Sequence, residues 1–274
     1  MNAGHERIAR AFAGSGKTAA LMPYMMGGFP DLETSRRIGQ AYVDAGADII
    51  ELGVPFSDPL ADGPVIHAAA TRALAAGATL DGVLELGAEL GESVPVVVMC
   101  YANPILARGF ARFAGALADA GVSGLIVPDI PHEEAADVFD ACEAAGVALV
   151  PLIAPTTTDD RLVAIGAQAR GFVYAVSLTG TTGERAALSE TFGARIARAR
   201  AHTDVPIALG FGIGTPEQGV QAAQAGADGV IIGSRLVRAA GEAEDPAAAV
   251  GELVAGFARA LARESHAAVQ APGS

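Results

Sequence analysis

The 274-residue chain has no tryptophan, a single lysine (Lys17) and two cysteines, and its formal net charge is −13. The excess of 31 acidic over 18 basic residues argues against binding to nucleic acid or to an anionic membrane surface, because both need clustered positive charge. Cys100 lies in an apolar run and Cys142 in an alanine-rich segment. We therefore expect two free thiols in a reducing compartment and not a disulfide.

Long apolar runs are also missing. The N-terminal segment MNAGHERIARAF is charged where a secretion signal needs an apolar core of roughly 7 to 15 residues, and no run approaches the ~18 residues that span a bilayer. We expect a soluble, cytoplasmic protein. The length and the 51% hydrophobic content fit one α/β domain over 1–274, with 264–274 expected to be a disordered tail.

Two further kinds of site are not predicted. The five histidines are scattered without the spacing of metal ligands, so we expect no metal site. The segment Gly14–Thr18 resembles a nucleotide P-loop, but Ala11 stands where that motif needs its first glycine, and the segment precedes a strand where a P-loop follows one.

What the chain does contain is an alternation of strands and helices. The run PVVVMCY at 95–101 is typical of a strand buried on both faces. Glycine recurs at the joints DAGADII, DAGVSGLIV, AAGVALV and QAGADGVII, where a helix ends before a strand. Eight such units predict a (β/α)₈ TIM barrel with an extra N-terminal helix and extra helices in the βα loops. The predicted strands are 19–26, 48–53, 95–101, 124–128, 147–153, 171–176, 206–211 and 229–233, and the predicted helices are 5–14, 34–45, 65–76, 80–90, 106–120, 133–145, 158–169, 188–202, 215–225 and 246–263.

Two acids stand out in the stretch ADIIELGVPFSDPLADGP at 47–64. Glu51 follows a β-branched pair at the end of a predicted buried strand, and Asp62 lies in the loop after it. Burying an unpaired charge costs several kcal/mol or forces the group to hold a proton, so this placement indicates a function. The alternatives are a partly solvated strand-end residue for Glu51 and a helix cap before Pro64 for Asp62.

Glycines gather after the last three predicted strands. They occur in TGTTG at 179–183, in GFGIGT at 210–215 and at Gly233-Ser234, where a short helix is expected to begin. Glycine lets backbone N–H groups approach an anion, and barrels commonly bind phosphate at these loops. The alternative is that the glycines only make tight turns.

From about Ala9 to Ala260 the chain resembles the α subunit of tryptophan synthase. The resemblance is carried by ELGVPFSDPLADGP, YANP at 101–104, PDIP at 128–131, the loop from Tyr174 through TGTTGER, GFGI at 210–213 and DGVIIGS at 228–234. It implies a lyase of tryptophan biosynthesis that cleaves indole-3-glycerol phosphate by a retro-aldol reaction into indole and glyceraldehyde 3-phosphate.

The resemblance also assigns residues. Glu51 becomes the proton shuttle, with its pKa raised by apolar surroundings, and Asp62 the ionised group that binds the indole N–H. Tyr174 falls beside the catalytic carboxyl, although packing at the rim would explain it equally. Some relatives carry Arg where this chain has Leu178, and there the arginine helps to hold the loop shut over the substrate. This chain lacks that ion-pairing option, so the resemblance does not say how its loop closes. Phosphate ligands are implied at Gly183, Gly212, Gly233 and Ser234, and Thr182 is a further substrate-binding residue of the same loop. Indole walls are implied at Tyr24, Leu52, Phe211 and Ile231, which could also be ordinary barrel filling.

A partner follows from the same resemblance. The family implies no metal and no cofactor in this chain, since pyridoxal phosphate belongs to a β subunit that receives indole through a tunnel in an αββα complex. Interface residues are expected at the barrel mouth, although proline, asparagine and aspartate also form turns. They are Pro55, Phe56, Asp58 and Pro59, within a segment that reaches Leu60, together with Asn103, Pro104, Asp129 and Pro131.

Other functions stay open at this point. One is a stand-alone lyase that releases indole, or a related phosphate-binding isomerase of histidine or tryptophan biosynthesis. The other is a catalytically silent barrel that only activates a β subunit; the presence of both acids speaks against it.

Overall fold

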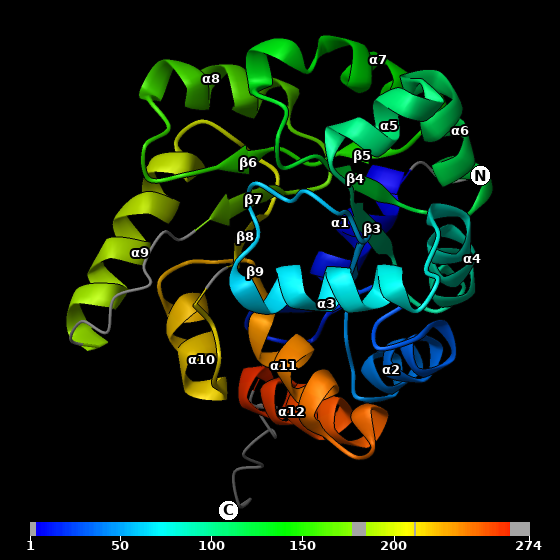
Figure 1. Ribbon diagram of the computed structural model, residues 1–274. Helices are drawn as coiled ribbons and strands as arrows, with labels where there is room; N and C mark the ends of the chain where they lie inside the picture. Colours follow the sequence, from blue (N-terminus) through cyan, green and yellow to red (C-terminus); the bar gives the residue numbers. More distant parts are fainter. Residues whose placement is uncertain (1–3, 177–184, 211, 264–274) are drawn as a thin grey trace, which may run out of the picture.

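Parallel strands and surrounding helices make up the computed structural model, which describes residues 4–176, 185–210 and 212–263 (Figure 1). In these ranges every named strand pairs with its neighbours in parallel. The strands are β1 (Ala20–Met26), β2 (Ile50–Gly53), β3 (Val96–Met99), β4 (Gly124–Ile126), β5 (Ala148–Leu149), β6 (Leu152–Ile153), β7 (Val173–Val176), β8 (Ile207–Gly210) and β9 (Gly229–Ile232). The helices are α1 (Gly4–Gly14), α2 (Leu32–Asp44), α3 (Pro64–Ala75), α4 (Leu80–Gly91), α5 (Ala102–Arg108), α6 (Phe110–Asp119), α7 (Ala136–Ala145), α8 (Asp159–Gln168), α9 (Arg185–Arg200), α10 (Pro216–Gln224), α11 (Ser234–Glu242) and α12 (Pro246–Leu261), with a 3₁₀ turn η1 (His132–Glu134).

The sheet closes through a strand that proline interrupts. The strand order is β5-β4-β3-β2-β1-β9-β8-β7-β6, so the two ends of the sheet are separated in sequence only by Val150 and Pro151. The Val150 N–H donates to Leu125 O of β4 at 2.8 Å, and Pro151 O accepts from Tyr174 N of β7 at 2.9 Å. The strand predicted at 147–153 therefore exists as two pieces, because Pro151 has no N–H, and it completes the predicted eight-stranded barrel.

The helix predicted at 106–120 is wrong in its bounds. Gly109, with φ +83°, separates α5 from α6. α5 begins at Ala102, so Asn103 and Pro104 lie in its first turn and not in a loop. Asp129 Oδ1 accepts the N–H of Ala102 at 2.9 Å and so caps this helix from a different loop.

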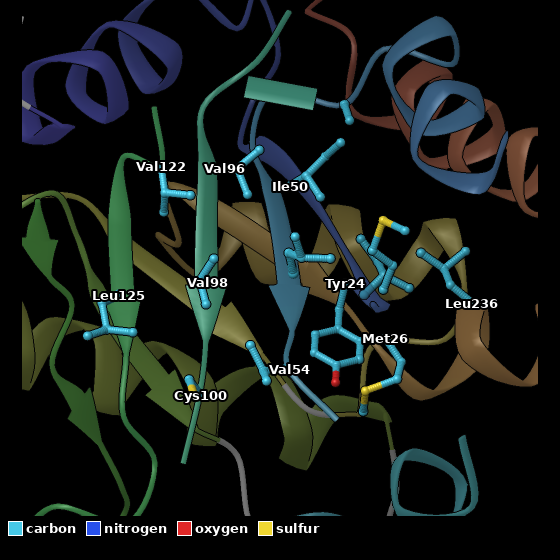
Figure 2. Packing of buried hydrophobic residues seen from close by; sticks show 14 of the residues in the cluster. Tyr24, Met26, Ile50, Val54, Val96, Val98, Cys100, Val122, Leu125 and Leu236 are labelled. Atoms are coloured by element: carbon cyan, nitrogen blue, oxygen red, sulfur yellow. The ribbon is translucent and has the colours of Figure 1, made fainter. Parts of the chain in front are cut away.

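Side chains of the strands alternate between the barrel interior and the helices. Leu21, Ile50 and Val98 belong to the outer cluster, part of which is drawn in Figure 2. The interior cluster consists of buried apolar side chains from strands all round the barrel. Ile8 of α1 packs against it at the end where the strands begin, which we call the lower end. The strand members are Met22, Ile49, Val97, Ile126, Ala148, Val150, Phe172, Tyr174, Ala208 and Ile231. Both faces of the strands are thus covered, as the unbroken apolar runs predicted.

Two repeated joints have the same hydrogen bonds. In Gly46-Ala47-Asp48 the aspartate accepts the N–H of Leu21 in β1 and forms an ion pair with Lys17. In Gly226-Ala227-Asp228 the aspartate accepts the N–H of Ile207 in β8 and forms an ion pair with Arg200. Lys17 follows α1 and lies 2.9 Å from Asp48, which agrees with the rejection of a P-loop. No helix of the described residues is long and apolar enough to cross a membrane.

Candidate active site

A cavity of about 270 Å³ opens at the carboxyl ends of the strands. Glu51 and Asp62 line one part of it, and the start of α11 lines another. Its remaining walls come from β1, β3, α3, β7, β9 and the loop after β8. The lining residues are Tyr24, Glu51, Asp62, Ile66, Met99, Tyr174, Gly212, Ile213, Gly214, Ile231, Gly233, Ser234, Arg235 and Arg238.

Glu51 is the most deeply buried acid of this cavity. It lies in β2 beside Tyr24 of β1, and its parity with Ile49 directs it into the barrel. Only 1% of the residue is exposed, and its Oε2 has no hydrogen-bond partner among the described residues. Burial, and secondarily the charge of Asp62, raise the pKa of Glu51 to about 8. The group is therefore predominantly protonated at neutral pH and can donate a proton.

Asp62 reaches the same cavity from the loop between β2 and α3. Burial raises its pKa, while a hydrogen bond from Tyr101 and the charge of His67 act in the opposite direction. The predicted cap of α3 is not made by Asp62: Gly63 is the N-cap residue and no side chain bonds there. The two acids, eleven positions apart in sequence, thus line one cavity as expected.

Tyr101 is a site residue that the sequence reasoning missed. Its hydroxyl accepts the N–H of Ala61 at 3.1 Å, next to Asp62, and its ring stacks on Phe56 with 5.3 Å between centroids. The residue therefore holds both ends of the loop that carries Asp62. The signal available in the sequence was its position at the carboxyl end of the predicted buried strand 95–101.

Two tyrosines line the cavity at either side of the barrel. Burial raises the pKa of both Tyr24 and Tyr174 well above the ordinary value, and the charge of Glu51 contributes in each case. A Cβ on Gly53 would lie 2.2 Å from the Tyr24 hydroxyl, and one on Gly210 would lie 2.3 Å from that of Tyr174. Glycine at these two strand ends is what admits the rings.

The predicted phosphate end is described in part. Gly212, with φ +84°, Gly233 and Ser234 line the cavity, and α11 begins at Ser234 as expected. Ile231 lines it as well, whereas Leu52 does not: its side chain lies against Gly87 of α4, so its assignment to the indole wall is wrong. Leu178, Thr182, Gly183 and Phe211 lie outside the described residues. Arg235 and Arg238 line the cavity and were not predicted.

The expected interface residues occupy the loops and the helix α5 at the mouth. Asp58 and Asn103 are exposed, but Pro55 is buried and offers no surface to a partner. Phe56, Pro59 and Pro104 are partly exposed, as is Asp129, and Pro131 is exposed. The most exposed large apolar side chain among them is Leu60, at 87%.

A larger cavity, of about 380 Å³, lies between α7 and α8. Its charged groups are already satisfied, since Arg161 pairs with Glu133 and Asp129 caps α5. Among the described residues no group of three histidine, cysteine, aspartate or glutamate side chains could hold a metal ion. The cavity with Glu51 is therefore the candidate active site.

Comparison with known proteins gives a consistent result. A family described as "Tryptophan synthase alpha chain" matches residues 11–266. A tryptophan synthase alpha chain of Synechococcus elongatus is 50% identical over 220 residues, covering 80% of this chain and 83% of the relative.

Two solved structures are similar in fold. One, of Mycobacterium tuberculosis tryptophan synthase, has a TM-score of 0.86 at 36% identity, covering 96% of this chain and 100% of the other. The second, described as the tryptophan synthase a2b2 complex of Pyrococcus furiosus, has a TM-score of 0.82 at 36% identity and covers 88% and 98%.

Proposed function

Because the chain belongs to the tryptophan synthase alpha chain family, it catalyses the alpha reaction of tryptophan biosynthesis, and we propose how its cavity residues divide that reaction. The substrate is indole-3-glycerol phosphate and the products are indole and glyceraldehyde 3-phosphate. The single observation that carries the proposal is the buried Glu51 with an unpartnered Oε2 in a cavity shared with Asp62.

Glu51 acts first as an acid and then as a base. With a pKa of about 8 it holds its proton at neutral pH and donates it to the indole carbon that carries the side chain. The resulting carboxylate takes the proton of the adjacent side-chain hydroxyl. That oxygen then forms a carbonyl, the carbon–carbon bond breaks, and its electron pair returns to the indole ring.

Asp62 stabilises the charge that develops meanwhile. Protonation of the ring carbon places positive charge on the ring nitrogen, and an ionised carboxylate that accepts the indole N–H favours this state. The hydrogen bond from Tyr101 supports the ionised form of Asp62 and holds its loop. In this arrangement Asp62 stays a charge and Glu51 moves the proton.

The remaining cavity residues bind the two ends of the substrate. Tyr174 lies on the side of the reacting carboxyl group, and Tyr24 and Ile231 form the indole wall, where Phe211 is also expected. Gly212, Gly233 and Ser234 take the phosphate, and Thr182 and Gly183 are expected to complete that end. The proton transfers need only carboxyl groups, so we assign no cofactor to this chain and place pyridoxal phosphate in a β subunit.

We assign the partner surface to the barrel mouth. The Pyrococcus furiosus relative is described as an a2b2 complex, and a mouth loop of this chain presents Leu60 to solvent. Phe56, Asp58 and Pro59 share that loop, and Asn103, Pro104, Asp129 and Pro131 lie on neighbouring elements. Leu60, Phe56 and Pro59 together expose apolar surface on this loop, and an apolar patch bordered by polar residues is typical of a protein–protein contact.

The test is an indole-release assay on indole-3-glycerol phosphate, with and without added β subunit. Glu51→Gln removes the transferable proton and is expected to lower turnover by at least about 1,000-fold, within the range of general acid–base effects. Glu92→Gln, at an exposed position outside the cavity, is the matched control. Undiminished turnover in Glu51→Gln contradicts the assignment.

The same assay separates the other functions. High activity without the β subunit identifies a stand-alone lyase. No activity in either condition, with intact activation of the β subunit, identifies a silent barrel.

A further inference from the structure

Two arginines of α11 border the cavity, and neither forms an ion pair within the described part of the chain. Arg235 and Arg238 both line it, beside Ser234, and both are exposed. Neither guanidinium has a hydrogen bond or ion pair with another residue of the described ranges. Arg161 and Arg198, by contrast, have their charge paired, with Glu133 and with Asp159.

The helix holds the two side chains on the cavity side. Leu236, Val237 and Ala240 of α11 are buried, and α11 packs against β1, α3 and α12, so its rotation is fixed; Leu236 appears in this packing in Figure 2. Arg235 and Arg238 are three positions apart and therefore share a face. A helical side chain leans toward the N-terminus of its helix, so the guanidinium of Arg238 covers the first turn, at Ser234.

The cavity needs positive charge for the proposed substrate. Glu51 and Asp62 line one part of it, and the chain as a whole carries a net charge of −13. A phosphate monoester is close to a dianion at neutral pH, and this field repels it. In the described part of the lining the positively charged side chains are Arg235 and Arg238, and both lie at the α11 end.

We propose that Arg235 and Arg238 bind the phosphate of the substrate and select phosphorylated over unphosphorylated indole-glycerol. Their charges act together with the backbone N–H groups at Gly233 and Ser234. Arginine suits this role because its planar guanidinium donates two parallel hydrogen bonds to a phosphate. The inference rests on the proposed function, because that function places the phosphate at this end.

The test compares Arg235→Gln, Arg238→Gln and the double variant with wild type, in the same indole-release assay with the β subunit present. Each single change is expected to raise KM about fivefold, and the double change at least about 20-fold, with kcat within about twofold; exposed ion pairs support effects of this size. Lysine at either position keeps the charge and recovers part of the loss. Arg112→Gln on α6, outside the cavity lining, is the control and leaves KM unchanged.

Inhibition by inorganic phosphate supplies an independent readout. Its inhibition constant rises in parallel with KM, and turnover of unphosphorylated indole-glycerol stays the same. An unchanged KM and phosphate inhibition constant in the double variant, or a loss confined to kcat, overturns the inference. Absence of turnover in the wild type contradicts the proposed function instead. In that case the binding of inorganic phosphate to wild type and to the double variant, measured by calorimetry, still decides the role of the arginines.

Discussion

Glu51 is the residue in which burial most directly produces reactivity. Its pKa is about 8 in the folded chain, against 4.5 for a fully solvated glutamate side chain. Between these values the folded state keeps a proton that the unfolded state has released. Stability attributable to this residue is therefore fully present below about pH 4.5 and is lost progressively as the pH rises toward 8.

Glu51→Gln should consequently gain stability over wild type at alkaline pH. One pKa unit corresponds to about 1.4 kcal/mol. We therefore expect the free energy of unfolding of Glu51→Gln, measured relative to wild type, to be a few kcal/mol higher at pH 9 than at pH 4. Urea denaturation at the two pH values measures this. Glu92→Gln should show no such pH-dependent difference, and a constant offset in Glu51→Gln would contradict the raised pKa.

Residue roles were predictable where a residue type is costly in its setting. Glu51 stood out because an acid rarely ends a buried strand, whereas the role of Asp62 came from the resemblance, since its position alone also suited a helix cap. Tyr101 and Arg238 did not, since a tyrosine after a strand and an arginine in a helix are ordinary. Only the folded loop and the position of α11 place them at the cavity.

At the scale of elements, the joint before β2 is held by a largely buried ion pair. Lys17 and Asp48 have side chains 12% and 11% exposed, and Asp48 also accepts the N–H of Leu21. The pKa of Asp48 is nevertheless raised, because burial outweighs the stabilising contacts. The pair therefore positions β1 against β2 more than it stabilises the fold. Removing one partner leaves the other charge buried without compensation, which destabilises the protein.

Lys17→Met is expected to destabilise the protein by about 2 kcal/mol, because it leaves the Asp48 carboxylate without its cation. Adding Asp48→Asn should recover most of that loss, since the amide oxygen still accepts the Leu21 N–H. Thermal or urea unfolding of the two single variants and the double variant forms the cycle. Arg36→Gln, which removes a more exposed pair with Glu89, is the control and should change the free energy of unfolding little. Additive effects at Lys17 and Asp48 would refute the coupling.

Element types were predictable and their interruptions were not. The order of strands and helices followed from apolar runs and glycine joints. The break at Gly109 depends on that residue adopting a positive φ, which many helical glycines do not adopt. The break at Pro151 depends on which side of the strand its missing N–H faces, and this is known only once β4 and β7 are both in place.

At the scale of the whole molecule, the barrel mouth combines the cavity with the proposed partner surface. Leu60 is 87% exposed on the loop whose far end carries Asp62, and Tyr101 anchors that loop at both Phe56 and Ala61. A partner that binds Leu60 would therefore restrain the position of Asp62. This links assembly to the ionised group that the reaction needs.

Leu60→Ser is expected to weaken binding to the β subunit by roughly tenfold or more, because burying a leucine side chain in a contact contributes about 1.5–3 kcal/mol. Turnover of the isolated chain should stay the same, because Leu60 does not line the cavity. Analytical ultracentrifugation and the indole assay measure the two effects. Leu106→Ser, at another exposed leucine, on α5, tests how far the surface extends, and unchanged assembly in Leu60→Ser would exclude this loop from the interface.

The helix α1 has a consequence for the order of folding. Ile8 is fully buried against the lower end of the interior cluster, the Gly4 N–H donates to Gly146 O, and Arg7 bonds to Gly121 O. These acceptors lie more than a hundred residues later in the chain. Because α1 is synthesised before these acceptors, it must stay exposed until β4 and β5 have been made, and it can dock only after them.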